Sequence, residues 1–136
     1  MKGTIETKEI ALSEIFPASQ KMKDDGYRLV QICCTSLAAG SVEHANALEM
    51  IYSFDKDLDL VNLKITIGAN TEIGSISPIY PAAYLYENEV HDLFGVSIKD
   101  MTLDFKGNLY KTAIPCPMNP DFKQRLRYIV TGFERE

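Results

Sequence analysis

The clearest pattern along the chain is an alternation of apolar and polar residues in two neighbouring segments. Residues 47–54 and 60–67 both alternate, and the apolar residues predicted to point inward are Leu48, Met50, Tyr52, Phe54, Val61, Leu63, Ile65 and Ile67. A period of two is typical of a half-buried β-strand. The polar link at residues 55–59 is short, so the two strands are predicted to form an antiparallel hairpin.

A third strand is predicted at residues 27–35, which are rich in β-formers and apolar on both faces. Such a pattern indicates burial on both sides, and we therefore expect this strand to be central in the sheet. Its adjacent cysteines, Cys33 and Cys34, are interpreted as two small buried side chains. Neighbouring strand residues point to opposite faces and do not readily form a disulfide with each other.

An N-terminal helix is predicted within residues 7–25. Its loose apolar stripe consists of Ile10, Leu12, Ile15, Phe16 and Met22. Gly26 is suited to end it. Two starting points remain open: Ser13 caps the helix with Pro17 at the edge of the first turn, or the regular helix begins at Pro17 itself.

The strongest helical pattern begins at Pro81 and ends at Phe94, and Gly95 follows in the position that favours glycine. One face is apolar and consists of Ala83, Tyr86, Val90, Leu93 and Phe94. The other side carries Glu87, Asn88, His91 and Asp92. We expect this polar side to face solvent or a partner.

The apolar periodicity fades after Gly95, and Pro115, Pro117 and Pro120 interrupt the chain. The predicted fold class is α/β (α+β): a small, mostly antiparallel sheet, an N-terminal helix, a second helix packed on the sheet, and an extended C-terminal tail. The predicted division is a core domain at residues 1–98 and an extended, basic, proline-containing arm at residues 99–136.

Charge is unevenly distributed between the body and the tail. Residues 1–104 carry 16 acidic and 8 basic side chains, a net charge of −8, whereas residues 105–136 carry 6 basic and 3 acidic ones, a net charge of +3. An acidic body argues against broad nucleic-acid binding. The basic tail indicates either an arm folded onto its own body or one that orders on a second protein.

Composition limits the remaining functional classes. With 136 residues, 3 cysteines and 2 histidines, the chain is predicted to be one domain with no disulfide framework and no metal of its own. It has neither a run of about 20 apolar residues nor the apolar start of a signal peptide. A cytoplasmic location is therefore expected.

The one dense group of ionisable residues lies on the second predicted helix and comprises Glu87, Glu89, His91 and Asp92. Glu87 and His91 are four residues apart, so they share a helix face and could form a metal or acid–base site. The competing interpretation is an ordinary solvated or partner-facing surface. We favour the latter, because so few ligands accompany the pair.

Residues 87–96, with the sequence Glu-Asn-Glu-Val-His-Asp-Leu-Phe-Gly-Val, resemble a family signature. The small hydrophilic subunit of NADH–quinone oxidoreductase (respiratory complex I) has a proline-started helix that ends in Glu-Arg-Glu-x-x-Asp-Leu-Phe-Gly-Ile. The predicted order of elements is also similar, so the resemblance covers most of residues 7–98.

Two residues depart from the respiratory signature: Asn88 replaces its arginine, and His91 replaces its usual aromatic residue. The tail around residues 104–110 and the prolines that follow instead resemble the short form found in energy-converting [NiFe] hydrogenases. The corresponding small subunit of the Ech type is similar, as are its equivalents in carbon-monoxide-induced hydrogenase and formate hydrogenlyase.

The resemblance implies a non-catalytic, cofactor-free assembly subunit that docks on a large catalytic subunit. The [NiFe] site and the iron–sulfur clusters would belong to that large subunit and to an iron–sulfur small subunit. The complex would lie on the cytoplasmic side of the membrane. The residues carried over as a docking motif are Pro81, Glu87, Glu89, His91, Asp92, Leu93, Phe94 and Gly95.

Three alternatives to the hydrogenase role remain. The first is the same structural role in a complex I-like NADH or ferredoxin–quinone oxidoreductase. The second is a stand-alone, self-associating adaptor, and the third is a small metal-dependent enzyme that uses Glu87 and His91.

Overall fold

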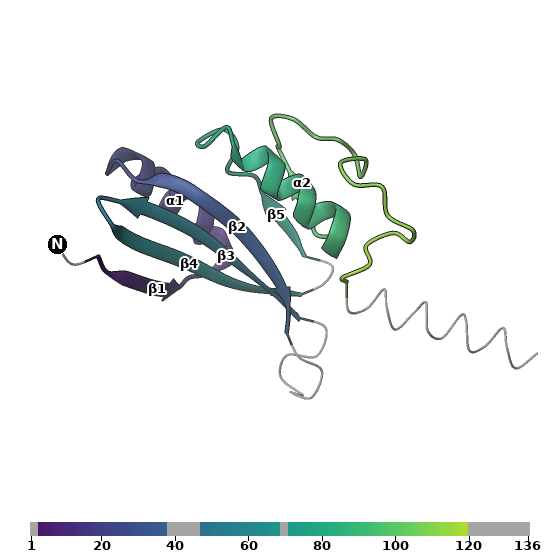
Figure 1. Cartoon of the computed structure of the whole chain (residues 1–136), viewed down its shortest axis with the longest axis horizontal. Coiled ribbons are helices and arrows are strands. Elements are labelled where there is room, and N and C mark those ends of the chain that lie inside the picture. The colour runs from purple at the N-terminus through teal and green to yellow at the C-terminus, as the bar shows by residue number, and fades with distance from the viewer. Residues whose placement is uncertain (1–2, 38–46, 69–70, 120–136) are drawn as a thin grey trace, which may run out of the picture.

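The computed structural model describes residues 3–37, 47–68 and 71–119 (Figure 1). In chain order its elements are β1 (Ile5–Glu9), the 3₁₀ turn η1 (Leu12–Glu14), α1 (Ile15–Asp24), β2 (Arg28–Ser36), β3 (Ala47–Lys56), β4 (Asp59–Gly68), β5 (Glu72–Gly74), α2 (Ala83–Phe94) and β6 (Ser97–Lys99). No helix in these ranges is long and apolar enough to cross a membrane.

Four strands form the main sheet in the order β1-β4-β3-β2. Strands β2, β3 and β4 form an antiparallel meander, and β1 is parallel to β4. The short strands β5 and β6 pair in parallel in a second sheet. The predicted α+β class, with a mostly antiparallel sheet and two helices, is confirmed.

The hydrophobic core lies on one face of the main sheet. All eight apolar positions of the alternating segments are buried, as predicted. They form one cluster with Ile15 of α1 and with Ala83, Val90 and Phe94 of α2. Because successive strand residues alternate between faces, both helices must cover the same side of the sheet.

The N-terminal prediction is partly wrong. Its first residues belong to the edge strand β1, and the helix begins at Ile15. Pro17 lies in the first turn, where its missing N–H costs no helical hydrogen bond, but the capping residue is Glu14 rather than Ser13. Gly26 follows the helix with φ +87°, which confirms it as part of the helix end.

Strand β2 is an edge strand, so its predicted central position is wrong. A bulge at Val30 interrupts the pairing with β3 between Leu29 and Gln31, which leaves Val30 exposed. Cys33 is also exposed rather than buried, and Cys34 is half-buried. The edge is covered by α2, whose Tyr86 hydroxyl donates a hydrogen bond to the Val30 carbonyl.

The predicted hairpin of β3 and β4 is confirmed, and Lys56 pairs with Asp59 across a two-residue turn. Asp57 and Leu58 have φ values of +49° and +74°, as a turn of type I′ requires. Leu58 is a poor residue for this conformation, because its Cβ crowds the backbone. Its side chain is 62% exposed and contributes little packing.

Replacing Leu58 with glycine should therefore stabilise the protein. We expect the free energy of unfolding to rise by about 0.5–1 kcal/mol, the relief of left-handed strain less the entropy that glycine adds to the unfolded chain. Urea denaturation measures this change. Leu58→Ala is the control, because it removes the side chain but keeps the strain; an equal gain in both variants would contradict the explanation.

Candidate functional site

Helix α2 is enclosed between the core and the chain that follows it. The segment of residues 103–119, here called the strap, runs along the side of α2 that faces away from the main sheet (Figure 1, green to yellow). The helix begins after a turn in which the Ala83 amide donates to the Tyr80 carbonyl. Pro81 lies within that turn and is exposed.

The polar side of α2 is largely buried, which corrects the expectation of a solvated surface. The side chains of Glu87 and Asn88 are fully buried, and Asp92 is 6% exposed. Glu89 and His91 are half-buried. Buried polar groups require hydrogen-bond partners, and here the partners come from the strap and from residues 75–77.

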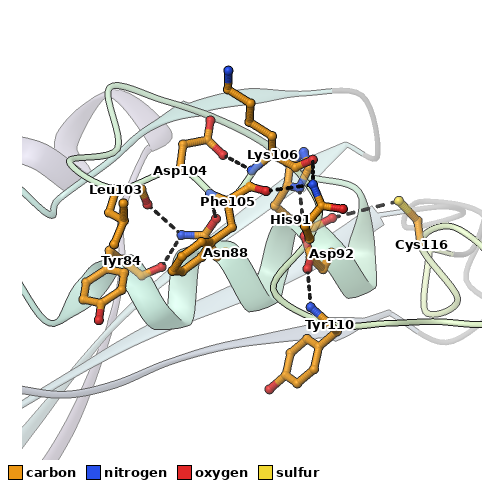
Figure 2. Close-up of polar contacts among 11 residues, drawn as sticks. Tyr84, Asn88, His91, Asp92, Leu103, Asp104, Phe105, Lys106, Tyr110 and Cys116 are labelled. Carbon is orange, nitrogen blue, oxygen red and sulfur yellow. Dashed lines mark hydrogen bonds and ion pairs between the residues drawn. The ribbon is translucent and has the colours of Figure 1, made fainter.

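Asn88 connects α2 to the start of the strap (Figure 2). Its Nδ2 donates to the carbonyls of Tyr84 at 2.7 Å and Leu103 at 2.9 Å. Its Oδ1 accepts from the Phe105 amide at 3.0 Å. One amide side chain thus satisfies both a carbonyl and an N–H of the strap.

Asp92 and Glu89 hold the middle of the strap through Tyr110. The Tyr110 amide donates to Asp92 Oδ2 at 2.8 Å, and the Tyr110 hydroxyl donates to Glu89 Oε2 at 2.9 Å. His91 Nδ1 lies 3.2 Å from Asp92 Oδ1. Glu89 and Asp92 therefore contact their own chain, and Figure 2 shows Asp92 with His91 and Tyr110.

The end of the strap supplies donors for the last carbonyls of α2. The Met118 amide donates to the Leu93 carbonyl at 2.8 Å, and Asn119 Nδ2 donates to the Phe94 carbonyl at 2.6 Å. Such terminal carbonyls have no partner within a helix. The strap therefore completes the C-terminal end of α2.

Gly95 makes this close approach of the strap possible. Its φ is +74°, the left-handed conformation expected of a glycine that ends a helix. A Cβ at this position would lie 3.0 Å from Cys116 Sγ and 3.3 Å from Asn119 Nδ2. The predicted end of the helix at Phe94, with glycine in the position after it, is confirmed.

Glu87 binds the other side, the segment before α2. Its carboxylate accepts from the Ser75 hydroxyl at 2.7 Å and from the Ile76 amide at 3.0 Å. Ser77 extends the network, because its hydroxyl lies 2.7 Å from that of Ser75 and accepts from the Thr102 amide. Burial raises the pKa of Glu87 to about 7, although these two hydrogen bonds oppose the shift.

The arrangement does not favour a metal or acid–base pair. Glu87 and His91 bind different partners rather than each other. In the described ranges no group of three or more His, Cys, Asp or Glu side chains is placed to hold a metal ion. Burial also raises the pKa of Cys34 to about 12 and that of Cys116 above its ordinary value, which disfavours the reactive thiolate forms.

The sequence pattern indicates the acidic residues of α2 but not the groups that bind them. Ser75, Tyr110 and Asn119 bind α2 directly and lie between 12 and 25 residues from their partners on the helix. Ser77 completes the site through Ser75 and the Thr102 amide. The one sequence signal for these contacts is Asn88, where a short amide side chain replaces the long, positively charged arginine of the respiratory signature.

Comparison with models of known protein families identifies the family of this chain. A sequence model of the family described as "Respiratory-chain NADH dehydrogenase, 30 Kd subunit" matches residues 9–127, which is most of the chain. The chain belongs to this family. The resemblance to the small hydrophilic subunit of complex I is thereby confirmed. The chain is thus a subunit of an oxidoreductase complex of the complex I type.

The fold of this family member is shared with a solved structure. A chain of the membrane-bound sulfane sulfur reductase (MBS), an archaeal respiratory membrane complex, superposes with a TM-score of 0.72 and 19% sequence identity. The similarity covers 98% of this chain and 79% of the other. A search of curated protein sequences found no significant match.

Replacing Asn88 with alanine should release the start of the strap. Two strap groups, the Leu103 carbonyl and the Phe105 amide, would lose their partner. We expect a loss of about 2 kcal/mol in unfolding free energy and faster hydrogen exchange at the Phe105 amide. Asn108→Ala is the matched control, because Asn108 is exposed and bonds only locally. Equal effects of both variants would contradict the role of Asn88.

Glu87 should make stability depend on pH. Its pKa is raised from 4.5 in the unfolded chain to about 7 in the fold, so the folded state favours the protonated form. The contribution of Glu87 to stability is therefore complete below pH about 4.5 and is lost as the pH rises through about 7. One pKa unit corresponds to about 1.4 kcal/mol, so we expect a loss of about 2–3 kcal/mol between pH 5 and pH 8.

Urea denaturation at pH 5 and pH 8 measures this loss, and Glu87→Gln should abolish most of it. Tyr52 is the titratable neighbour whose pKa rises through burial and then through the charge of Glu87; it stays protonated over this range. Glu89→Gln is the control and should retain the wild-type loss. Parallel pH profiles for wild type and Glu87→Gln would exclude Glu87 as the cause.

Proposed function

We propose that the chain is a non-catalytic, cofactor-free assembly subunit of a membrane-bound energy-converting [NiFe] hydrogenase of the Ech, carbon-monoxide-induced or formate hydrogenlyase type. In this role it docks on the large catalytic subunit, beside the iron–sulfur small subunit, on the cytoplasmic side of the membrane. Two observations support the proposal: the hydrogen bonds between Asn88 and the strap, and the exposed apolar side chains of α2 and the strap.

The observation that carries the proposal is the pairing of Asn88 with the strap. Its amide both donates to the Leu103 carbonyl and accepts from the Phe105 amide. Arginine, which the respiratory motif has at this position, carries donors but no acceptor and would leave the Phe105 amide unpaired. Asn88 therefore matches the course of the strap, which favours the hydrogenase branch over the respiratory one.

The outer surface of α2 and the strap supports a docking role. Among the described residues nine large hydrophobic side chains are exposed, and five of these lie on α2 or the strap: Leu85, Leu103, Tyr110, Ile114 and Met118. We call these five the docking face. Apolar side chains concentrated on one part of a surface mark protein–protein contacts.

The predicted C-terminal arm changes in one respect. Its residues up to 119 lie on the body of the same chain, through the hydrogen bonds of the strap. Residues 120–136 lie outside the described residues, so their part in the arm stays a prediction. The strap would thus present its outer side chains to the partner while its backbone is held on α2.

A similar fold in the archaeal sulfane sulfur reductase supports membership of a membrane-bound respiratory complex without restricting it to NADH dehydrogenases. The same structural role in a complex I-like NADH or ferredoxin–quinone oxidoreductase is the competing assignment. The two are distinguished by the partners that co-purify with the chain.

A tagged full-length chain, purified from gently solubilised native membranes, should recover a [NiFe]-type large subunit and an iron–sulfur small subunit, identified by mass spectrometry. Ile114→Glu, on the docking face, should lower this recovery by at least about tenfold, the effect of about 1.4 kcal/mol. Leu58→Glu is the control, because Leu58 is exposed on the β3–β4 turn.

Each outcome discriminates between the assignments. Recovery of a quinone-reducing dehydrogenase instead of a hydrogenase would favour the competing role. Recovery of the chain alone would overturn the assembly role. An equal loss for Ile114→Glu and Leu58→Glu would contradict the docking face but not the assembly role.

A further inference from the structure

Strand β1 forms an open edge of the main sheet. No strand lies beyond it in the described ranges, and all five of its side chains are exposed. The opposite edge differs, because the hydroxyls of Tyr80 and Tyr86 donate to carbonyls of Tyr27 and Val30 there. An exposed strand edge is a template for pairing with another strand.

The backbone groups available on β1 follow from its pairing with β4. The Thr4 carbonyl accepts from the Leu60 amide, and the Ile10 amide donates to the Lys64 carbonyl. Even-numbered residues therefore turn their backbone groups toward β4. Because these groups alternate along a strand, Ile5, Thr7 and Glu9 present theirs at the open edge.

We propose that β1 pairs antiparallel with β1 of a second copy of this chain, about a two-fold axis at Thr7. Thr7 would exchange both backbone hydrogen bonds with Thr7 of the second copy, and the two four-stranded sheets would become continuous. An isologous contact of this kind closes on itself and does not propagate. The inference is independent of the proposed function, since it involves neither α2 nor the strap.

Charge complementarity selects this register. Glu6 and Lys8 lie on the same face of β1, where their side chains approach to 3.7 Å. Pairing about Thr7 places Glu6 opposite Lys8 of the second copy, and the symmetry repeats the pair. Opposite charges directly across an antiparallel pair are favourable, and like charges are unfavourable.

Other registers lack this match. Centring the pair on Glu6 places two carboxylates opposite each other, and centring it on Lys8 does the same with two ammonium groups. Parallel in-register pairing also sets like charges side by side. The order Glu6-Thr7-Lys8 therefore permits one antiparallel register and disfavours its neighbours, as edge strands do when they avoid open-ended association.

The test is a charge exchange measured by analytical ultracentrifugation of the full-length chain at low salt. The contact is smaller than a standard interface, so we expect the wild type to dimerise with a dissociation constant of about 0.1 mM. Glu6→Lys and Lys8→Glu should each weaken self-association at least about tenfold, because each places like charges in both pairs. Mixing the two variants should restore a dimer, since each pair is then again one lysine and one glutamate.

Glu9→Lys is the matched control, because Glu9 lies on the other face of the strand and would oppose Ile5 of the second copy. It should leave the dissociation constant within about twofold. A wild type that stays monomeric up to about 1 mM would overturn the proposal. So would a dimer that neither exchange weakens, or two monomeric variants whose mixture does not associate.

Discussion

The burial of the polar side of α2 is the constraint on which the rest of the site depends. A fully buried Asn88 and a nearly buried Asp92 require hydrogen-bond partners in a region that excludes water. Backbone groups of the strap bind Asn88 and Asp92, and the end of the strap also donates to the last carbonyls of the helix. Polar contacts therefore set much of the strap's path, and the ring contact of Phe105 with Tyr84 adds to them. Four of its large hydrophobic side chains remain exposed: Leu103, Tyr110, Ile114 and Met118.

The acidic residues of the family motif have a structural task in this chain. Glu87 joins α2 to the segment before it, and Asp92 joins α2 to the segment after it. A carboxylate that accepts hydrogen bonds from its own backbone is not available as an open metal ligand or as a general base. The motif therefore closes the fold around one helix, while recognition of other proteins falls to the side chains that remain exposed.

The elements predicted correctly from the sequence are those whose periodicity reports burial directly. The inward positions of β3 and β4 are apolar throughout, and Gly95 ends α2 as predicted, although the helix begins at Ala83 rather than at Pro81. Strand β1 was missed because every side chain in it is exposed, so no apolar alternation marks it. Strand β2 was placed in the centre of the sheet because the sequence spacing puts Leu29 on the face opposite to Ile32 and Cys34. The bulge at Val30 shifts the alternation, so that Leu29 lies on the same face as these two residues.

The candidate site was only half predictable for a related physical reason. Helical periodicity identifies which residues share a face, but it does not reveal what covers that face. Asp92 and its partner Tyr110 are 18 residues apart, and β6 is the only regular element between the end of α2 and Tyr110. A polar helix face looks the same in sequence whether water or a later segment of the chain lies against it.

The parallel pairing of β1 with β4 also determines the order in which the sheet can assemble. Strands β2, β3 and β4 are joined by local connections, whereas Ile5 finds its partner Leu60 55 residues later in the chain. Closing so large a loop costs more conformational entropy than forming the hairpin. Of the four strands, the one synthesised first is therefore the last to join the sheet, and during synthesis β1 must wait until β4 has emerged from the ribosome and folded back onto β3.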